Sequence, residues 1–537
     1  MLVPLAVLPL ACADASRPGD EEDDTIADSS GEADDDDDGL GSSSSETDAD
    51  ESSSSGGAPE PTFPIPVTGI SITDVEANEG VGVPIVVGGE WVDGASRNAE
   101  LIKDRRMLLR AFWAIEPDFT PREIKATLDL HYPDGSVESA SRTLMVEGES
   151  SLTVLDRSFW WGLTEDLVQP QMRFQITLWE VEPLAEVQGE PAAFPDEPAY
   201  VGVEAPDMTL RVVIVPIEHD VGASCPSAPV IDDAALAVLH DELYKQNPVS
   251  RIEIAVRDPI VWTESLVSFG GLLGELASLR DADQADPGTY YYGVVPPCDG
   301  GPSGVGGQAI DIPGFPSSGN GWSRTAVGRW YGQIGSTANT FVHEIGHTQG
   351  RRHVYCNGEE GGPTPVYPYL EGDIGCWGFD VVDFDTIFKP DVAKDYMTYC
   401  GNTWVSDWGW RQVVPYIREI TSWDMQDAPP LDDDSRVLVG IVDGDDEDAT
   451  WVLTRGEIGM RAPAVDDRIE LVDEHGVRHD LAASLGAMGE GGYNLVVQVP
   501  AGVAIDKVRS IDRVRASGTM PIDEVKSAGQ RLRIGAR

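Results

Sequence analysis

Three of the eight histidines in this 537-residue chain fall within eleven residues, at positions 343, 347 and 353. His343 and His347 are four residues apart, so on a helix their imidazoles lie on one face, one turn above the other. Two imidazoles at this spacing can bind the same metal ion, and H-E-x-x-H is a zinc-binding pattern. We therefore expect a helix over residues 337 to 349 with a zinc site on one face.

Gly350 follows the expected helix where helices often end, because glycine adopts the left-handed conformation of a helix C-terminus without strain. A sharp turn there would bring His353 back towards the two helical imidazoles. Three neutral histidines leave a fourth position on zinc open, as in catalytic sites. Zinc would lower the pKa of a bound water towards about 7. Glu344 would lie beside the metal, placed to take that water's proton and pass it to a leaving amine.

These residues resemble the metzincin zinc endopeptidases, whose signature H-E-x-x-H-x-x-G-x-x-H is met at every fixed position. That family has a methionine turn beneath the metal, and Met397 in KDYMTYC matches it, 44 residues after His353. Tyr399 matches the M-x-Y pattern of astacin-like and serralysin-like members, which implies a tyrosine that ligates zinc at rest and stabilises the oxyanion. A purely structural tyrosine is the alternative.

The resemblance covers residues 208 to 425 and includes departures from the family pattern. Gln349 stands where relatives usually have an apolar residue, and Arg351 and Arg352 place two charges in the loop. Val354 replaces the Asp, Ser, Glu or Pro of the best-known subfamilies. The subfamily and substrate therefore stay open. The wider pattern looks like that of uncharacterised exported bacterial members distantly similar to lipoprotein mucinases.

Two disulfides are expected among the six cysteines. The resemblance brings the segments around the third histidine and the methionine together beneath the zinc. Cys356 and Cys400 each lie three residues beyond one of these two residues, so we expect them to pair. Cys225 with Cys298 is the second expected pair. An exported chain is the context in which disulfides form.

The elements that must position this site follow from hydrophobic periodicity. Strands alternate with amphipathic helices over residues 208–428, which predicts an α/β layer. Residues 64–207 and 429–537 contain short alternating runs between turns, which predict flanking β-sandwich-type domains. The expected fold is multidomain α/β plus β, with a metzincin-like catalytic domain in the middle. A strand near residues 303–311 would pair with an extended substrate.

The N-terminus predicts export. Residues 1–12 are apolar but too short to span a bilayer, and LPLAC resembles a lipobox with Cys12 as the lipidation candidate; plain secretion is the alternative. Residues 13–63 are acidic and rich in Ser and Gly, which predicts a disordered linker. The formal net charge of −56 argues against binding nucleic acid or an anionic membrane surface.

The sequence thus favours an exported, monomeric zinc endopeptidase acting on protein or glycoprotein substrates, with Glu344 as general base. A surface-binding or adhesin-type lipoprotein with a vestigial zinc site is one alternative. The other is a structural zinc protein, which needs a closed fourth ligand from Tyr399 or a cysteine. Calcium is a weaker expectation, from the aspartate runs and from the acidic loop 443–448.

Overall fold

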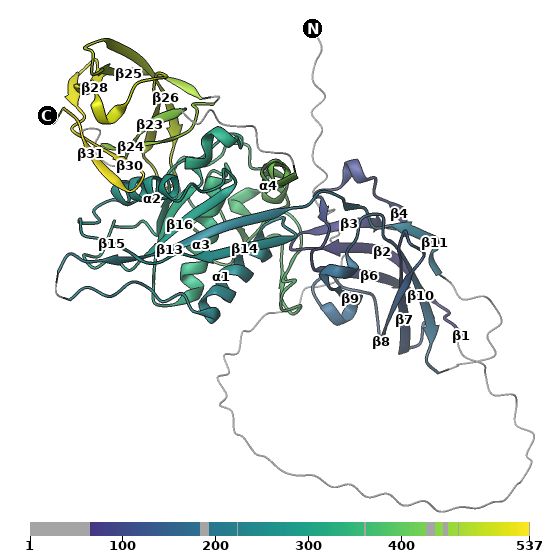
Figure 1. Cartoon of the computed structure of the whole chain (residues 1–537). Coiled ribbons are helices and arrows are strands. Elements are labelled where there is room, and N and C mark those ends of the chain that lie inside the picture. The colour runs from purple at the N-terminus through teal and green to yellow at the C-terminus, as the bar shows by residue number, and fades with distance from the viewer. Residues whose placement is uncertain are drawn as a thin grey trace, which may run out of the picture.

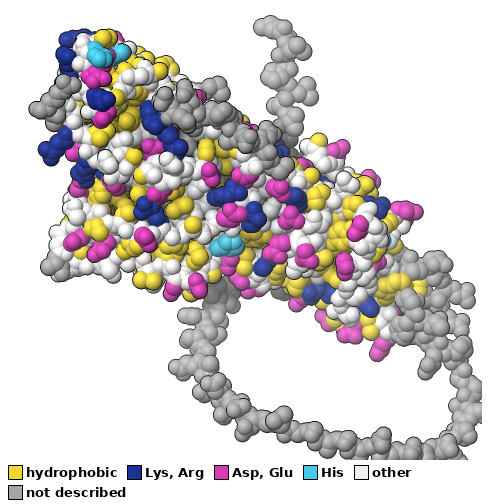
Figure 2. Space-filling model, viewed as in Figure 1, with side chains coloured by type: hydrophobic (Ala, Val, Ile, Leu, Met, Phe, Trp, Pro, Cys, Tyr) yellow, Lys and Arg dark blue, Asp and Glu magenta, His cyan; other side chains and the backbone are white. Residues whose placement is uncertain are grey.

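The computed structural model describes residues 65–182, 193–222, 224–358, 361–425, 435–443, 449–459 and 461–535. It is a β-rich, multidomain fold with few helices, in which three groups of strands follow one another along the chain (Figure 1). The expected signal segment 1–12, including Cys12, lies outside the described residues, and so does the acidic linker 13–63. On the face shown in Figure 2, acidic and basic side chains are interspersed.

The N-terminal unit is a β-sandwich. One sheet has the order β1-β10-β7-β8, with β11 paired to β10: Ile65–Pro66, Arg173–Glu180, Arg122–His131, Val137–Val146 and Ala193–Tyr200. The other has the order β4-β3-β2-β6-β9: Glu90–Trp91, Gly82–Val87, Ile70–Asn78, Met107–Ile115 and Phe159–Leu163. Short parallel strands β5 (Leu101–Ile102) and β12 (Val203–Glu204) also pair. Alternate apolar side chains of both sheets share one core.

The central unit is a six-stranded sheet with the order β14-β13-β16-β18-β17 and β15 paired to β13: Arg251–Val256, Thr209–His219, Thr289–Val295, Thr325–Arg329, Gly307–Ala309 and Ile260–Trp262. Its pairings are parallel except that of β17, which lies antiparallel to β18 at one edge. The helices are α1 (Asp233–Gln246), α2 (Gly270–Ala282), α3 (Ile334–Thr348) and α4 (Asp407–Met425). Four two-residue strands precede α4: β19 (Gly378–Phe379), β20 (Ile387–Phe388), β21 (Lys394–Asp395) and β22 (Thr403–Trp404).

Alternation along β16 explains why helices cover both faces of the central sheet. Tyr290 and Tyr292 belong to the apolar core that includes α1, α3 and α4. Tyr291 and Val295, which point to the opposite face, belong to a second core that includes α2. A strand buried on both faces is expected where helices flank a largely parallel sheet.

The C-terminal unit corrects one expectation, because its strands form one continuous sheet and not a two-sheet sandwich. The order is β29-β28-β25-β26-β27-β23-β24-β30-β31: Gly518–Pro521, Ser510–Arg515, Ala462–Val472, Arg478–Ala487, Tyr493–Gln498, Arg436–Val442, Ala449–Arg455, Glu524–Ser527 and Gln530–Arg533. Ile511 of β28 and Val525 of β30, from opposite ends of this order, share one apolar core. The sheet therefore curls around its own interior, so the alternating pattern alone did not distinguish one curled sheet from two.

A buried arginine joins the N-terminal and central units. Arg105 donates hydrogen bonds to the backbone oxygens of Glu79 (3.0 Å), Val249 (3.0 Å) and Tyr244 (2.7 Å). Its guanidinium lies over the rings of Tyr244 and Trp410, at 4.2 and 5.0 Å from their centroids. Five donors in a planar fork let one side chain satisfy carbonyls from both units.

Replacing this arginine should destabilise the chain. We expect Arg105→Met to lower the free energy of unfolding by about 3 kcal/mol or more, because each buried carbonyl left without its donor costs about 1–3 kcal/mol. Urea unfolding measures the effect. Arg251→Met is the matched control, since the Arg251 side chain is 64% exposed. Equal losses in the two variants would contradict the bridging role of Arg105.

Candidate metal centre

Helix α3 ends as its glycine predicts. Gly350 has a φ of +83°, and its N–H donates to the carbonyl of His347 at 2.9 Å. The N–H of Arg351 donates to the carbonyl of Gly346 at 3.0 Å. These two bonds form a Schellman motif, which reverses the chain direction after the helix. A Cβ at position 350 would lie 2.5 Å from the backbone oxygen of Pro313, so a larger residue does not fit there.

The turn brings His353 back to the two helical histidines. The ring centroid of His353 lies 4.7 Å from that of His347 and 5.4 Å from that of His343. Each imidazole is oriented by a backbone carbonyl that contacts its Nδ1. The partners are Tyr396 O for His343 (2.8 Å), Arg351 O for His347 (2.7 Å) and Gly361 O for His353 (2.7 Å). A carbonyl at Nδ1 fixes the tautomer with a proton on that atom and a lone pair on Nε2.

The three Nε2 atoms converge with a carboxylate oxygen of Glu490. All four candidate ligand atoms lie within 4.8 Å of one another. The Nε2 atoms of His347 and His353 are 3.1 Å apart, and that of His343 is buried 3.2 Å from Glu490 Oε1. Burial lowers the pKa of His347 to about 4, so its ring is neutral at pH 7. Converging lone pairs beside a carboxylate fit a bound cation, and this group could hold one metal ion.

A turn containing Met397 lies beneath the histidines. The N–H of Met397 donates to Asp395 Oδ1 (2.9 Å), and the Met397 carbonyl accepts from the N–H of Val354 (2.9 Å). Met397 is fully buried, and its sulfur would lie 2.6 Å from a Cβ at Gly346. The preceding residue supplies the carbonyl that orients His343. The turn therefore supports the helix and positions one candidate ligand.

Two of the unusual loop residues have structural roles. Arg351 donates to the buried carboxylate of Asp395 at 3.3 Å, which ties the chain after α3 to the methionine turn. Gln349 donates from Nε2 to Asn247 Oδ1 at 3.0 Å, next to the end of α1. Both side chains are buried, so a polar residue is accommodated at each position by a specific partner.

Glu344 is a buried acid beside the candidate metal position. Its side chain packs against the edge strand, since a Cβ at Gly307 would lie 2.7 Å from Glu344 Cγ. Its Oε2 has no hydrogen-bond partner. Burial, reinforced by the nearby Glu490, raises the pKa of Glu344 well above its usual range. A buried carboxylate with an unpartnered oxygen costs stability, which is typical of acids kept for proton transfer.

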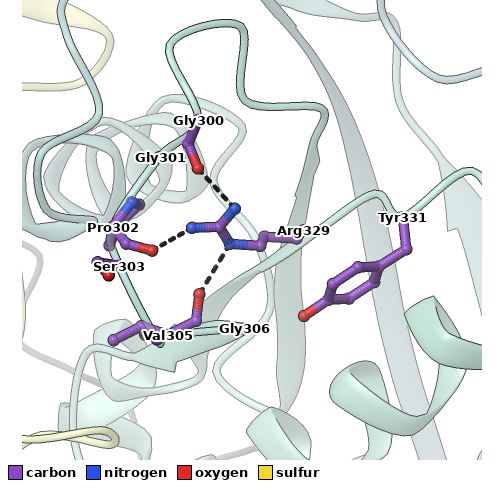
Figure 3. A pocket seen from close by; sticks show the side chains of 9 residues that line it. Gly300, Gly301, Pro302, Ser303, Val305, Gly306, Arg329 and Tyr331 are labelled. Carbon is purple, nitrogen blue, oxygen red and sulfur yellow. Dashed lines mark hydrogen bonds between the residues drawn. The ribbon is translucent and has the colours of Figure 1, made fainter.

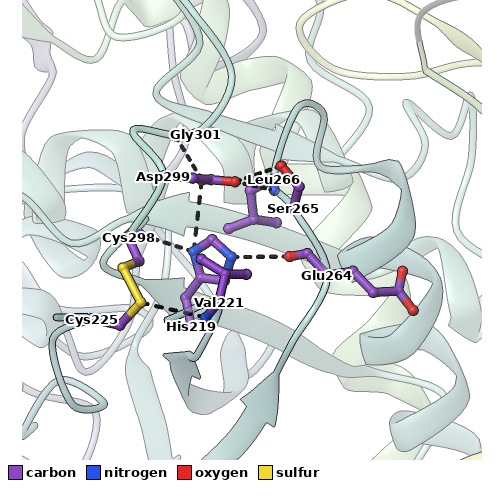
Figure 4. Close-up of a disulfide and its surroundings, with 9 residues drawn as sticks. All are labelled: His219, Val221, Cys225, Glu264, Ser265, Leu266, Cys298, Asp299 and Gly301. Carbon is purple, nitrogen blue, oxygen red and sulfur yellow. Dashed lines mark hydrogen bonds and ion pairs between the residues drawn. A yellow bond between two sulfur atoms is a disulfide. The ribbon is translucent and has the colours of Figure 1, made fainter. Parts of the chain in front are cut away.

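Both expected disulfides are confirmed. Cys356 and Cys400 are bonded, with their Cα atoms 6.2 Å apart, and join the chain after His353 to the chain after Met397. Cys225 and Cys298 are bonded with a Cα–Cα distance of 5.0 Å. The N–H of Cys298 also donates to Nδ1 of the buried His219 at 2.9 Å (Figure 4). Cys376 is buried and belongs to neither disulfide.

Tyr399 lies at the mouth of the cluster. Its ring centroid is 4.9 Å from that of His353 and 6.0 Å from that of His343. Its hydroxyl donates to Glu490 Oε2. The side chain is 43% exposed, so it can be reached from solvent. The phenol thus stands next to the converging nitrogens, with its hydroxyl directed at the carboxylate.

Glu490 is the residue that sequence reasoning missed. It belongs to the turn between β26 and β27, 137 residues after His353, and its Oε1 lies 3.2 Å from His343 Nε2 and 3.1 Å from His353 Nε2. Burial opposes its ionisation, but the three imidazoles beside it hold the pKa of Glu490 well below its usual range. The sequence G-E-G-G predicts a turn. Nothing in it indicates where that turn docks.

The loop that precedes the edge strand β17 lines a hollow. The hollow has a volume of about 490 Å³ and is lined by residues 300–306 with Arg329 and Tyr331 (Figure 3). Arg329 shapes this loop by donating to the backbone oxygens of Gly300 (2.7 Å), Val305 (2.8 Å) and Pro302. The glycine-rich stretch 300–306 therefore lines the hollow and leads into the edge strand.

The acidic loop 443–448 is expected to bind calcium, and of its residues the structure describes only Asp443. Asp443 Oδ2 accepts from the N–H groups of Phe269 (3.1 Å) and Gly270 (3.2 Å), at the start of α2. Asp443, which belongs to the C-terminal unit, therefore accepts hydrogen bonds from backbone N–H groups that have no partner within α2. Residues 444–448 lie outside the described residues. Calcium binding stays a prediction.

The two disulfides are typical of a protein that folds in the periplasm or outside the cell. Among the described helices, none combines the length and apolar character needed to cross a membrane.

Comparison with known proteins leaves the family of this chain open. No family model matches the sequence, and no curated protein matches it. Among 24 solved chains that match in structure is a calcium-binding mutant of Bacteroides uniformis beta-glucuronidase 2. The match has 10% sequence identity and a TM-score of 0.13, and covers 47% of this chain and 25% of that one. This chain thus spans about a quarter of that protein's length, and so low a score carries no argument.

Metal content tests the cluster directly. We expect the purified chain to bind one zinc or cobalt ion, and His353→Ala to lose most of it, because the remaining donors no longer enclose the ion. Elemental analysis after dialysis measures the stoichiometry. His475→Ala is the matched control, since His475 is 79% exposed and outside the cluster. Equal metal content in both variants would rule the cluster out as the binding site.

Proposed function

We propose that this chain is an exported zinc-dependent endopeptidase of the metzincin type. The observation that carries the proposal is the convergence of three Nε2 atoms, each set by a carbonyl at Nδ1, with the buried carboxylate of Glu344 beside them. Imidazole nitrogens are ligands that zinc prefers. Support also comes from the glycine-terminated helix, the buried methionine turn and the disulfide between them.

The chain's own residues divide the proposed chemistry among them. A zinc ion held by the three histidines would polarise the scissile carbonyl and lower the pKa of a bound water, supplying a nucleophile at neutral pH. Glu344 accepts the proton of the attacking water on its unpartnered oxygen and delivers it to the leaving amine.

Tyr399 and the edge strand are proposed to bind the substrate. The Tyr399 hydroxyl stands beside the histidine rings and can donate a hydrogen bond to the developing oxyanion. Strand β17 pairs with β18 on one side, and its other side is where an extended peptide would add by main-chain hydrogen bonds. The hollow lined by residues 300–306 then lies where a substrate side chain or a glycan can be accommodated.

The proposed substrates are extracellular proteins or glycoproteins, and the protease acts as a monomer. Two disulfides agree with action outside the cytosol. The formal net charge of −56 disfavours nucleic-acid partners. A lipid anchor on Cys12 would be the chain's contact with a membrane. Zinc would be the metal that the chain binds.

A second candidate function is favoured by Glu490. Four donors, three imidazoles and a carboxylate, can close a structural metal site in which no position is left for a water. In that case the chain would be a binding protein of the adhesin type, with its function in the flanking β-rich units. Glu344 argues for the protease, because a structural site gains nothing from a buried carboxylate oxygen without a partner.

Removal of the general base tests the proposed function. We expect Glu344→Gln, at equal measured zinc content, to cleave casein or a mucin about 10²–10⁴-fold more slowly, because proton transfer to and from the attacking water is lost. Glu474→Gln, a change on an exposed hairpin tip, is the matched control.

Since the Glu490 carboxylate lies where water and substrate would reach the metal, each protein is assayed both with Glu490 intact and as Glu490→Ala. Cleavage by the parent but not by the Glu344 variant supports the protease. Absence of cleavage by every zinc-loaded form contradicts it and favours the binding protein.

A further inference from the structure

We propose that the turn 487–492 between β26 and β27 is a built-in inhibitor of the metal site. Glu490 supplies a fourth ligand to the metal, and the backbone of the turn lies along β17 in place of a substrate. The inference deepens the proposed function and rests on it. It makes the resting chain a latent enzyme whose C-terminal unit closes the site.

The backbone of the turn follows the edge strand. The N–H of Gly489 donates to the carbonyl of Ala309 at 3.1 Å, and the N–H of Ile312 donates to the carbonyl of Ala487 at 2.8 Å. The two segments therefore run in opposite directions. Gln308 adds a side-chain bond from Nε2 to the carbonyl of Gly491 at 3.3 Å. The turn thus occupies the Ala309 carbonyl of β17, a main-chain group that an extended peptide would need.

The side chain of Glu490 completes the occupation of the site. Its Oε1 lies 3.2, 3.8 and 3.1 Å from the Nε2 atoms of His343, His347 and His353. Its Oε2 accepts from the Tyr399 hydroxyl. One carboxylate therefore faces all three candidate metal ligands and also engages the tyrosine proposed to stabilise the oxyanion. The Glu490 side chain is only 8% exposed, so water has little access past it.

The glycines around Glu490 allow this close approach. A Cβ at Gly489 would lie 2.8 Å from His347 Cδ2 and 3.1 Å from the backbone nitrogen of Ala309. Gly491 and Gly492 have φ values of +95° and +80°. Glu490 itself has a φ of +56°, a conformation that is costly for a residue with a Cβ and persists where the surroundings enforce it. The turn is built to deliver a carboxylate at the expense of local strain.

The base of the turn is fixed to the central unit, so opening must be local. Arg461 forms an ion pair with Asp311, which is fully buried, and Asn494 donates to the carbonyl of Ile310 at 2.9 Å. Met488 and Val496 belong to the apolar core that also contains α2. Departure of the whole C-terminal unit would expose that core to water. Displacement of residues 489–492 alone breaks a few hydrogen bonds and uncovers the candidate metal site.

Removing the carboxylate tests the inhibitor. We expect Glu490→Ala to raise the rate of casein cleavage about tenfold or more. The parent chain would have an open site in about 10% or less of its molecules, and the variant in all of them. In the cobalt-substituted chain the visible absorption should change, because the ion loses a ligand. Cobalt affinity should fall at least about tenfold. The isosteric, uncharged Glu490→Gln is the second variant, and Glu474→Ala is the matched control, with folding checked by thermal unfolding.

The readouts separate the two proposals. A higher cleavage rate together with a changed cobalt spectrum supports the inhibitor. An unchanged spectrum, or a cleavage rate equal to that of the parent, overturns it while leaving the protease in place. A changed spectrum with no cleavage by any form keeps Glu490 as a ligand but overturns both the protease and the inhibitory role. The double variant Glu344→Gln/Glu490→Ala should cut far more slowly than Glu490→Ala alone, because the uncovered site then lacks its general base.

Discussion

The candidate metal centre depends on three hydrogen bonds between imidazole Nδ1 atoms and backbone carbonyls. Each bond turns one Nε2 towards the same point, and without them the rings could rotate or change tautomer. The carbonyls belong to three separate segments: the methionine turn, the Schellman turn and the loop after the third histidine. Much of the surrounding structure can be understood as the means of holding these three carbonyls in place.

Several unrelated interactions serve that end. The disulfide between Cys356 and Cys400 joins the third-histidine loop to the methionine turn. The ion pair of Arg351 with Asp395 joins the Schellman turn to the same place. Because both of these side chains are buried, breaking the pair would leave a charge in an apolar environment. The geometry of the donors is therefore fixed by covalent and electrostatic links before any metal is considered.

What could be predicted from the sequence was local. The H-E-x-x-H spacing, the glycine at the helix end and the alternation of strands and helices each depend on neighbouring residues. Helix α3 (Ile334–Thr348) overlaps the helix expected over residues 337 to 349. The pairing of Cys356 with Cys400 followed from a family resemblance that implied which turns meet. The position of Glu490 could not be predicted, because it depends on how an entire sheet docks against α2 through apolar side chains. The same limit applies to the curled C-terminal sheet, whose alternation is that of any half-buried strand.

The position of Glu490 also sets an order of events during synthesis. The three histidines, the methionine turn and the Cys356–Cys400 disulfide are all encoded before Met425, the end of α4, whereas Glu490 follows in the next unit. Chains are made from the N-terminus, and domains generally fold as units in that order. A nascent chain therefore passes through a stage at which the histidine cluster is assembled but the carboxylate has not yet arrived. On the proposed function, a metal ion that bound in that interval would be enclosed when the last part of the chain folds.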